Sequence, residues 1–187
     1  MAYGNRVKTD SLSPTYSNAA YELGTVYVEG PDEVAANGSG VTPVVAASLF
    51  TLLRGERTWV FIRAVGNIIA GDLVKLNGVA VPYVGARDNT DEGTKWLMLG
   101  VADHNINNND YGWIIQKGTC VVQAQAGVAA GDLLASDGNT ANGEVDTWTA
   151  GAGLSNRIVG IALEAEDAAA PTGIGFVQAR INLSSGS

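Results

Sequence analysis

Few residues in this sequence have the chemistry that catalysis requires. The chain contains one histidine, His104, and one cysteine, Cys120. A Ser-His-Asp or Cys-His site would have to use His104, which falls in a polar stretch, so we expect a solvated loop residue there. Cys120 lies in an apolar run, where a thiol behaves as a small hydrophobic side chain. The sequence therefore predicts no catalytic residue, no cofactor and no enzymatic activity.

Oxygen-bearing side chains gather at two places, and neither completes a known site. Residues 103–110 alternate Asp and Asn in a pattern similar to that of a calcium loop, but Asn108 and Ile114 replace its usual glycine and glutamate. Glu164 and Glu166 lie two residues apart in an acidic, alanine-rich stretch that is typical of an exposed turn. We expect polar loops at both places and no metal site; calcium binding is the alternative for the first.

Aromatic and basic side chains are better candidates for contacts with another protein, because Trp, Tyr and Arg are enriched at interfaces. Trp59 and Trp113 lie in apolar runs and are predicted to be core residues. The polar N-terminal segment has two interpretations that both stay open: a frayed chain end, or an arm that becomes ordered on a partner. The candidate contact residues are Tyr3, Arg6, Lys8, Tyr16 and Trp148.

Composition and charge restrict the class of protein. Hydrophobic residues make up 46% of the 187 residues and charged residues 16%, which is typical of a globular protein. The net charge of −8, with 11 scattered Lys and Arg, argues against a nucleic-acid partner. We expect no membrane partner and no signal peptide, since there is no long apolar run and no basic-then-apolar start. The single cysteine favours folding in a reducing cytosol.

A repeat with a spacing of 60 residues organises most of the chain. After the last matched pair the register slips by two residues, so that 114–116 aligns with 176–178. Two copies of one small unit indicate a duplicated scaffold and argue against an active site built once. The matched pairs include 60–64 with 120–124, 69–74 with 129–134, and 99–102 with 159–162.

Short apolar runs between glycine-rich turns predict an all-β fold. The chain has 24 glycines, and its turn signals recur about every 8–12 residues, which favours a sandwich or barrel-like domain. A strand is predicted over 24–30, whereas 44–53 fits either a helix or a strand, and we favour the strand. The predicted division is an N-terminal arm at 1–20 and a β-rich domain at 21–187. That domain contains two related units, at about 58–117 and 118–183.

The repeated motifs resemble those of the head decoration (cement) proteins of tailed bacteriophages. Their shared pattern is Ala-Gly-Asp-hydrophobic followed by Gly-Val-Ala, and the resemblance covers about residues 58–183. It implies a structural virion protein on the capsid exterior, assembled in the host cytoplasm. It also implies that the protein binds the major capsid protein, stabilises the subunit lattice and forms a homo-oligomer, either a dimer or a trimer. The residues that carry the resemblance are Ala70–Val74, Leu99–Ala102, Val128–Leu134 and Val159–Ala162.

An alternative function stays open beside that one. The chain could be a phage fibre or tail protein, or a carbohydrate-binding β module. In that case Trp148 would stack on a sugar, and the asparagine-rich loop at 103–110 would form hydrogen bonds with it.

Overall fold

The fold is all-β, which confirms the predicted class. The computed structural model describes residues 15–31, 55–78, 81–89, 97–137, 143–149, 158–166 and 174–183. The prediction for 44–53 lies outside these ranges. The strands are β1 (Val26–Glu29), β2 (Arg57–Ala64), β3 (Leu73–Leu76), β4 (Val84–Arg87), β5 (Met98–Ala102), β6 (Tyr111–Gln125), β7 (Leu133–Asp137), β8 (Glu144–Thr147), β9 (Gly160–Ala162) and β10 (Ile174–Asn182).

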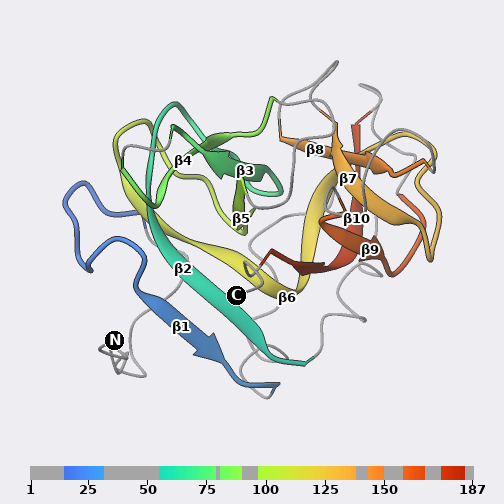
Figure 1. The fold of residues 1–187 in the computed structure, drawn as a ribbon, viewed down its shortest axis with the longest axis horizontal. Helices are drawn as coiled ribbons and strands as arrows, with labels where there is room; N and C mark the ends of the chain where they lie inside the picture. The colour runs from blue at the N-terminus through green and yellow to red at the C-terminus, as the bar shows by residue number, and fades with distance from the viewer. Residues whose placement is uncertain are drawn as a thin grey trace.

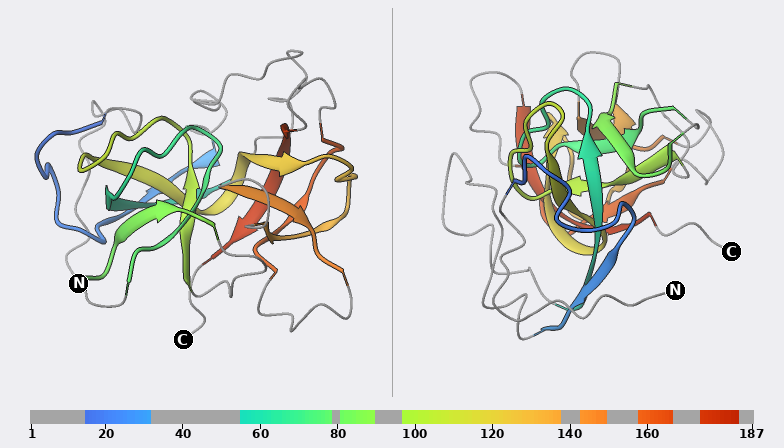
Figure 2. Two further views of the ribbon diagram at one scale, coloured as in Figure 1. Left: turned by 90° about the horizontal axis from the view of Figure 1, so that it is seen from above. Right: turned by 90° about the vertical axis from the view of Figure 1, so that its left-hand side faces the viewer.

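The strands close into two small barrels that share β6. In the first barrel β2 pairs with β4, β4 with β3, β3 with β5, β5 with β6, and β6 with β2. In the second, the order β6-β8-β7-β9-β10 returns to β6 in the same way. One pairing in each barrel is parallel and the others are antiparallel. The two groups of strands lie side by side, with β6 running through both (Figures 1 and 2).

The strand pairings of the two barrels repeat at the sequence spacing. Ala64 pairs with Gly85 between β2 and β4, and the residues 60 positions later pair between β6 and β8. The last strand departs from this spacing. Ala102 pairs with Ile114 and Ala162 with Ala179, so that Ile114 corresponds to a residue 65 positions later. The predicted alignment of 114–116 with 176–178 is therefore wrong, because the loop before β10 holds more extra residues than the sequence match suggested.

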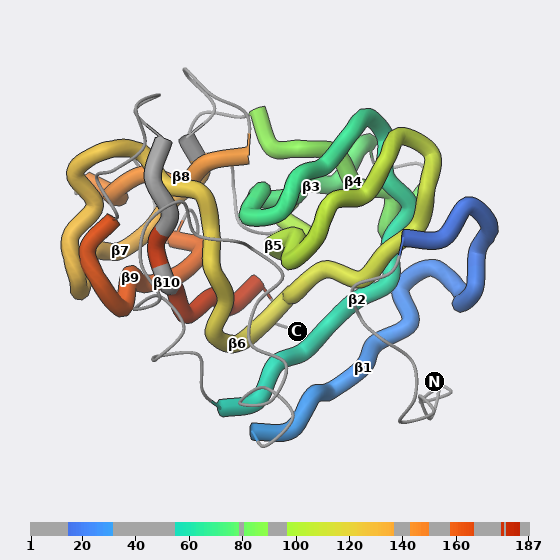
Figure 3. The backbone as a smooth tube through the Cα atoms, turned by 180° about the vertical axis from the view of Figure 1, so that it is seen from behind, coloured from blue at the N-terminus to red at the C-terminus, as the bar shows by residue number. Residues whose placement is uncertain are grey.

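Strand β6 bends between the two barrels (Figure 3). Its pairing with β2 ends at Lys117, and its pairing with β10 runs from Lys117 to Gln125, so Gly118 lies where the strand enters the second barrel. Gly118 has a φ of +114°, a conformation that favours glycine. A Cβ at this position would lie 2.5 Å from the carbonyl oxygen of Glu56. The bend therefore depends on a residue without a side chain, and it lets one strand of 15 residues serve both barrels.

The interior of the first barrel is a compact apolar cluster from the inward faces of its strands, consistent with period-2 alternation along each strand. Trp59 and Trp113 point to the other face and are 2% and 1% exposed, which confirms that they are core residues. They belong to a second cluster that continues into the interior of the second barrel. The first cluster contains Val60, Ile62, Ala64, Ile68, Val74, Leu99, Ala102, Ile106 and Ile114.

The N-terminal part of the described chain covers the first barrel. Strand β1, predicted from its flanking glycines, pairs antiparallel with β2. Glu29 of β1 accepts a hydrogen bond from Trp59 Nε1 at 2.9 Å and forms a buried ion pair with Arg57 at 3.8 Å. Since removing one member of a buried pair leaves an uncompensated charge, this contact fixes β1 in its register.

Candidate interaction surface

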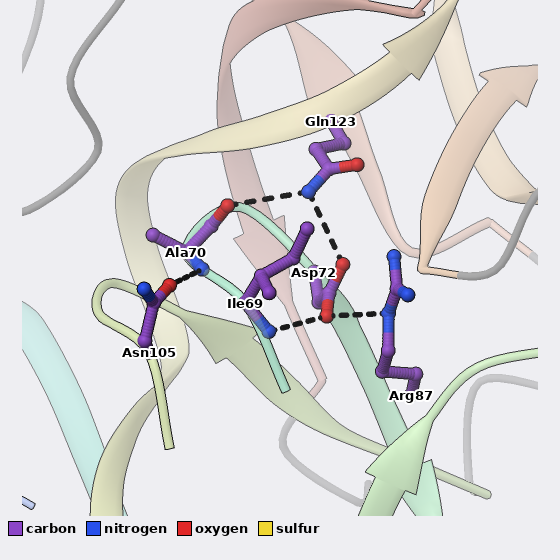
Figure 4. A network of polar contacts seen from close by, with 6 residues as sticks. All are labelled: Ile69, Ala70, Asp72, Arg87, Asn105 and Gln123. Atoms are coloured by element: carbon purple, nitrogen blue, oxygen red, sulfur yellow. Dashed lines mark hydrogen bonds and ion pairs between the residues drawn. The ribbon is translucent and has the colours of Figure 1, made fainter. Parts of the chain in front are cut away.

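The aspartate of the first Ala-Gly-Asp turn (Ala70–Asp72) is buried and contacts side chains from other parts of the molecule (Figure 4). The buried Asp72 carboxylate accepts a hydrogen bond from the Ile69 backbone N–H at 2.7 Å. It also forms an ion pair with Arg87 Nε at 2.7 Å and accepts a bond from Gln123 Nε2 at 3.2 Å. Gln123 lies on β6 in the second barrel, so this turn links the two units. The backbone of Gly143, before β8, completes the enclosure by bonding to Leu73 and Asp88.

The second turn has the same backbone and a more open environment. Gly71 and Gly131 have φ values of +91° and +92°, and each donates its N–H to the alanine that ends the equivalent strand. Asp132 accepts a bond from the Ala129 N–H at 2.8 Å and from Thr147 Oγ1 at 3.0 Å. Asp132 is half-buried, and residues 129–131 are exposed. The two aspartates thus fix the same turn, and only the first is built into an interface between units.

Burial dominates the electrostatics of the first turn. It raises the pKa of Asp72 to about 6, against the opposing effects of the Ile69 hydrogen bond and the Arg87 charge. The carboxylate is ionised at neutral pH, where its three donors can hold it. The members of this network bond to one another and to the backbone. The network is therefore a structural device that joins the two barrels.

A row of outward-facing side chains crosses four adjacent strands in each barrel. We call these the first outer row (Asp88, Leu73, Val101 and Ile115) and the second outer row (Trp148, Leu133, Ile161 and Arg180). Members of a row are cross-strand neighbours by register or by the adjoining backbone hydrogen bond, and such neighbours share a face.

The two outer rows differ sharply in burial. All four members of the first row are 0% exposed. In the second row Leu133 is 39% and Ile161 is 37% exposed, Trp148 is half-buried and Arg180 is exposed. The two central residues are therefore apolar in both rows, but they are buried only in the first. Exposed large apolar side chains that lie side by side mark candidate contact surfaces, whereas isolated ones are ordinary.

Comparisons with known proteins give a likeness to solved structures and no match in sequence. No protein-family model matches the sequence, and no curated protein matches it. Among solved structures, the chain is similar to one described as "The crystal structure of head fiber gp8.5 N base in bacteriophage phi29". The two chains are 16% identical, the match covers 69% of this chain and 97% of the other, and the TM-score is 0.44. That score describes a partial overlap of two chain paths.

The predicted contact residues fall in different parts of the molecule. Tyr3, Arg6 and Lys8 lie outside the described residues. Tyr16 is half-buried and exchanges two backbone hydrogen bonds with Tyr111, at 2.9 and 2.8 Å. Its ring makes an edge contact with Phe61 at 5.9 Å between centroids. Tyr16 thus helps to anchor the chain entering β1, and any contact with a partner remains a prediction.

Trp148 is the predicted contact residue that the structure places on the second outer row. Its backbone N–H donates to the Leu133 carbonyl at 2.7 Å, so its side chain lies next to the exposed apolar pair. The indole Nε1 is buried and has no hydrogen-bond partner in the described structure. Sequence reasoning missed Leu133, Ile161 and Arg180. Their one signal was the repeat, which matches Leu133 to a leucine and Ile161 to a valine.

His104 corrects the prediction of a solvated loop residue. The side chain is 8% exposed and packs against Gly112, and neither ring nitrogen has a hydrogen-bond partner among the described residues. Burial lowers the pKa of His104 to about 4, so the imidazole is neutral at physiological pH. The sequence misplaced His104 because a polar stretch was expected to be solvated, whereas Asp103 and His104 are both buried and Asn105 is exposed.

The other candidate residues have structural contacts. In the loop at 103–110, Asn105 Oδ1 accepts the Ala70 N–H, and Asn108 Oδ1 accepts the Gly66 N–H. Glu166 Oε2 accepts the Gly127 N–H. The described residues contain no cluster of His, Cys, Asp and Glu arranged for a metal ion, and none of their helices could span a membrane. Cys120 is 1% exposed, in agreement with a hydrophobic role.

Proposed function

We propose that this chain is a structural protein of a bacteriophage virion, which binds the outer surface of the capsid and stabilises the lattice of major capsid subunits. The observation that carries the proposal is the position of the motifs that resemble those of head decoration proteins. Those motifs form the two equivalent turns and the strands beside them, so the resemblance concerns the scaffold itself. Recognition is then left to surface side chains on a rigid β framework.

Such a protein needs affinity and no chemistry. A protein that binds the assembled lattice and not its free subunits stabilises the lattice by mass action, by about 2.7 kcal/mol when its concentration is 100 times its Kd. A homo-oligomer would join several weak contacts into one strong attachment. The buried, neutral His104 and the self-contained Asp72 network are compatible with this inert role.

The direct test is binding to purified heads of the virus whose genome encodes the chain. We expect the protein to pellet with the heads at a saturating, fixed ratio to capsid subunits, and to raise the temperature at which the heads disassemble. Protein alone and heads alone are the controls. A protein that stays in the supernatant at every concentration contradicts the proposal.

The predicted arm is tested by deleting residues 1–14 and no more. Residues 15–20 must stay, because Tyr16 is bonded to Tyr111 at the edge of the first barrel. We expect the truncated protein to melt at the wild-type temperature and to occupy fewer sites on heads, since an extended arm gains contacts only on its partner. Unchanged occupancy would remove the arm from the mechanism.

The fibre or carbohydrate-binding alternative has its own signature. In that case the wild-type protein would bind glycans on an array, Trp148→Ala would abolish the signal, and heads would carry little of the protein over their lattice. Glycan binding without lattice binding would favour this alternative.

A further inference from the structure

The second outer row combines features of a protein-protein contact. Leu133 and Ile161 are paired across β7 and β9 and are both more than one-third exposed. Trp148 flanks them on one side with an unpartnered, buried indole N–H, and Arg180 flanks them on the other. Four strands at about 4.8 Å spacing make a row about 14 Å long. An aromatic and an arginine around an apolar centre are the residue types that dominate binding energy at interfaces.

The molecule itself shows how such a row is buried. In the first barrel the equivalent row is fully buried, and the backbone of Gly143 bonds to two of its members, Leu73 and Asp88. The covering element is thus part of the same chain. Within the described residues, no segment pairs with Leu133 in that way.

A second copy cannot cover the row by a head-to-tail contact. In such a contact its first barrel would pack on the second outer row as the second barrel packs on the first outer row. The residues equivalent to Gln123 and Gly143 in the first barrel are Arg63 and Tyr83. Gly24 lies against the Tyr83 ring, where a Cβ would come within 2.3 Å of it. Gly24 and Thr25 also form backbone hydrogen bonds with Phe61, on the strand that carries Arg63. The segment before β1 therefore occupies the surface that a head-to-tail contact would need.

The charges along the row favour a contact with itself. Arg180 lies at one end, on β10. Trp148 lies at the other end, with the exposed Asp146 two residues before it and so on the same face of β8. If two rows face each other about a twofold axis between Leu133 and Ile161, the Arg180 end of each row meets the Trp148 end of the other. An arginine is then placed over an indole and beside a carboxylate.

We propose that two copies of this chain associate through their second outer rows, related by a twofold axis. Leu133 and Ile161 of both copies form the apolar centre, and each Arg180 contacts Trp148 and Asp146 of the partner subunit. This deepens the proposed function, because it assigns a surface to the expected homo-oligomer and selects the dimer over the trimer. Its test needs no capsid, so it can fail while lattice binding succeeds.

The first test is the mass of the full-length protein in solution, measured by light scattering or sedimentation over a range of concentrations. We expect a concentration-dependent dimer for the wild type. Leu133→Asp should raise the dimer Kd at least about tenfold, because it places an unpaired carboxylate in an apolar contact. The matched control is Val81→Asp, which changes a 52% exposed residue of the first barrel and should leave the Kd unchanged.

A charge exchange tests the geometry without altering the apolar centre. Arg180→Glu should weaken the dimer, and Arg180→Glu combined with Asp146→Arg should restore it, since the exchanged charges meet again only in a twofold contact. Both residues are exposed, so the variants keep the fold, and a circular dichroism spectrum verifies this.

Several outcomes would overturn the proposal. A monomeric wild type at all concentrations would do so, as would a dimer that Leu133→Asp leaves intact. A trimer that the same substitution dissociates would overturn the twofold geometry. A monomer whose head binding is lost with Leu133→Asp would identify the row as a capsid contact and reject self-association.

Discussion

The two Ala-Gly-Asp turns have nearly the same backbone and very different surroundings. Asp72 is fully buried among Ile69, Arg87 and Gln123, whereas Asp132 is half-buried and bonds to its own turn and to Thr147. The difference arises because the second barrel packs over the first turn and no equivalent unit in the described structure packs over the second. A repeat in sequence therefore specifies a local conformation, and the neighbouring unit decides whether the same residue becomes core or surface.

The largest expected difference comes from removing the two aspartates. At pH 7, Asp72→Ala should reduce the free energy of unfolding by about 3 kcal/mol, because the Arg87 charge, the buried Gln123 amide and the Ile69 N–H lose their acceptor. Asp132→Ala should cost less than about 1 kcal/mol, since its donors can reach water. Urea unfolding of both variants measures the difference. Equal losses would show that the enclosure of the first turn adds nothing.

Substituting Gly143, which packs against Asp72, and Gly131 of the second turn tests the same difference with glycines. Gly143→Ala should cost about 2 kcal/mol, because the residue has a φ of +85° and its Cβ would lie 2.4 Å from Asp72 Oδ1. Gly131→Ala has the same backbone strain and open space around the Cβ, so about 1 kcal/mol is expected. Thermal and urea unfolding report both values. If Gly143→Ala were no worse than Gly131→Ala, the contact with Asp72 would be loose.

His104 should give the stability a pH dependence that comes from the first barrel. Its pKa is about 4 in the folded protein and 6.5 for an unperturbed histidine, so the unfolded chain takes up the proton first as pH falls. The wild type should therefore lose about 1.4 kcal/mol from this residue between pH 8 and pH 5.5.

The matched variant is His104→Leu, which cannot take up a proton. Subtracting its urea unfolding curve at each pH from that of the wild type isolates the histidine from the carboxylates, including Asp72, whose raised pKa acts in the opposite direction below about pH 6. A pH-independent difference between the two proteins would contradict the burial of a neutral imidazole.

The smallest expected loss of stability concerns the residues that contact each aspartate from the neighbouring strand. Thr147→Val removes one hydroxyl hydrogen bond to the half-buried Asp132, where water can take its place, and should cost about 0.5 kcal/mol. Arg87→Met removes the charged partner of the buried Asp72 and should cost more. Parallel denaturation experiments decide the order, and a reversed order would mean that exposure does not govern these contacts.

The match of 69–74 with 129–134 predicted that the two segments are copies of one unit, and they do have the same turn backbone, at which glycine and aspartate have narrow roles. It also placed the strands that follow the turns. It did not predict β4 and β8, which lie outside the matched segments and yet pair in the same register in both barrels. These strands share no residues because backbone hydrogen bonds define them, and such bonds leave little trace in side-chain identity.

Burial was harder to predict from sequence than conformation was. Leu73 and Leu133 are the same residue in the same motif, yet one is 0% and the other 39% exposed. The burial of His104 was not predicted, because its polar neighbours in the sequence were taken to indicate a solvated residue. Both cases depend on which unit packs over which, and that information lies in contacts between residues far apart in the chain.

Electron cryomicroscopy of purified heads incubated with the protein tests the proposed function most directly. The expected image shows added density on the outer surface, repeating with the capsid lattice and absent from untreated heads. Heads with an unchanged outer surface, or density confined to one vertex or to the tail, would contradict a lattice-stabilising role.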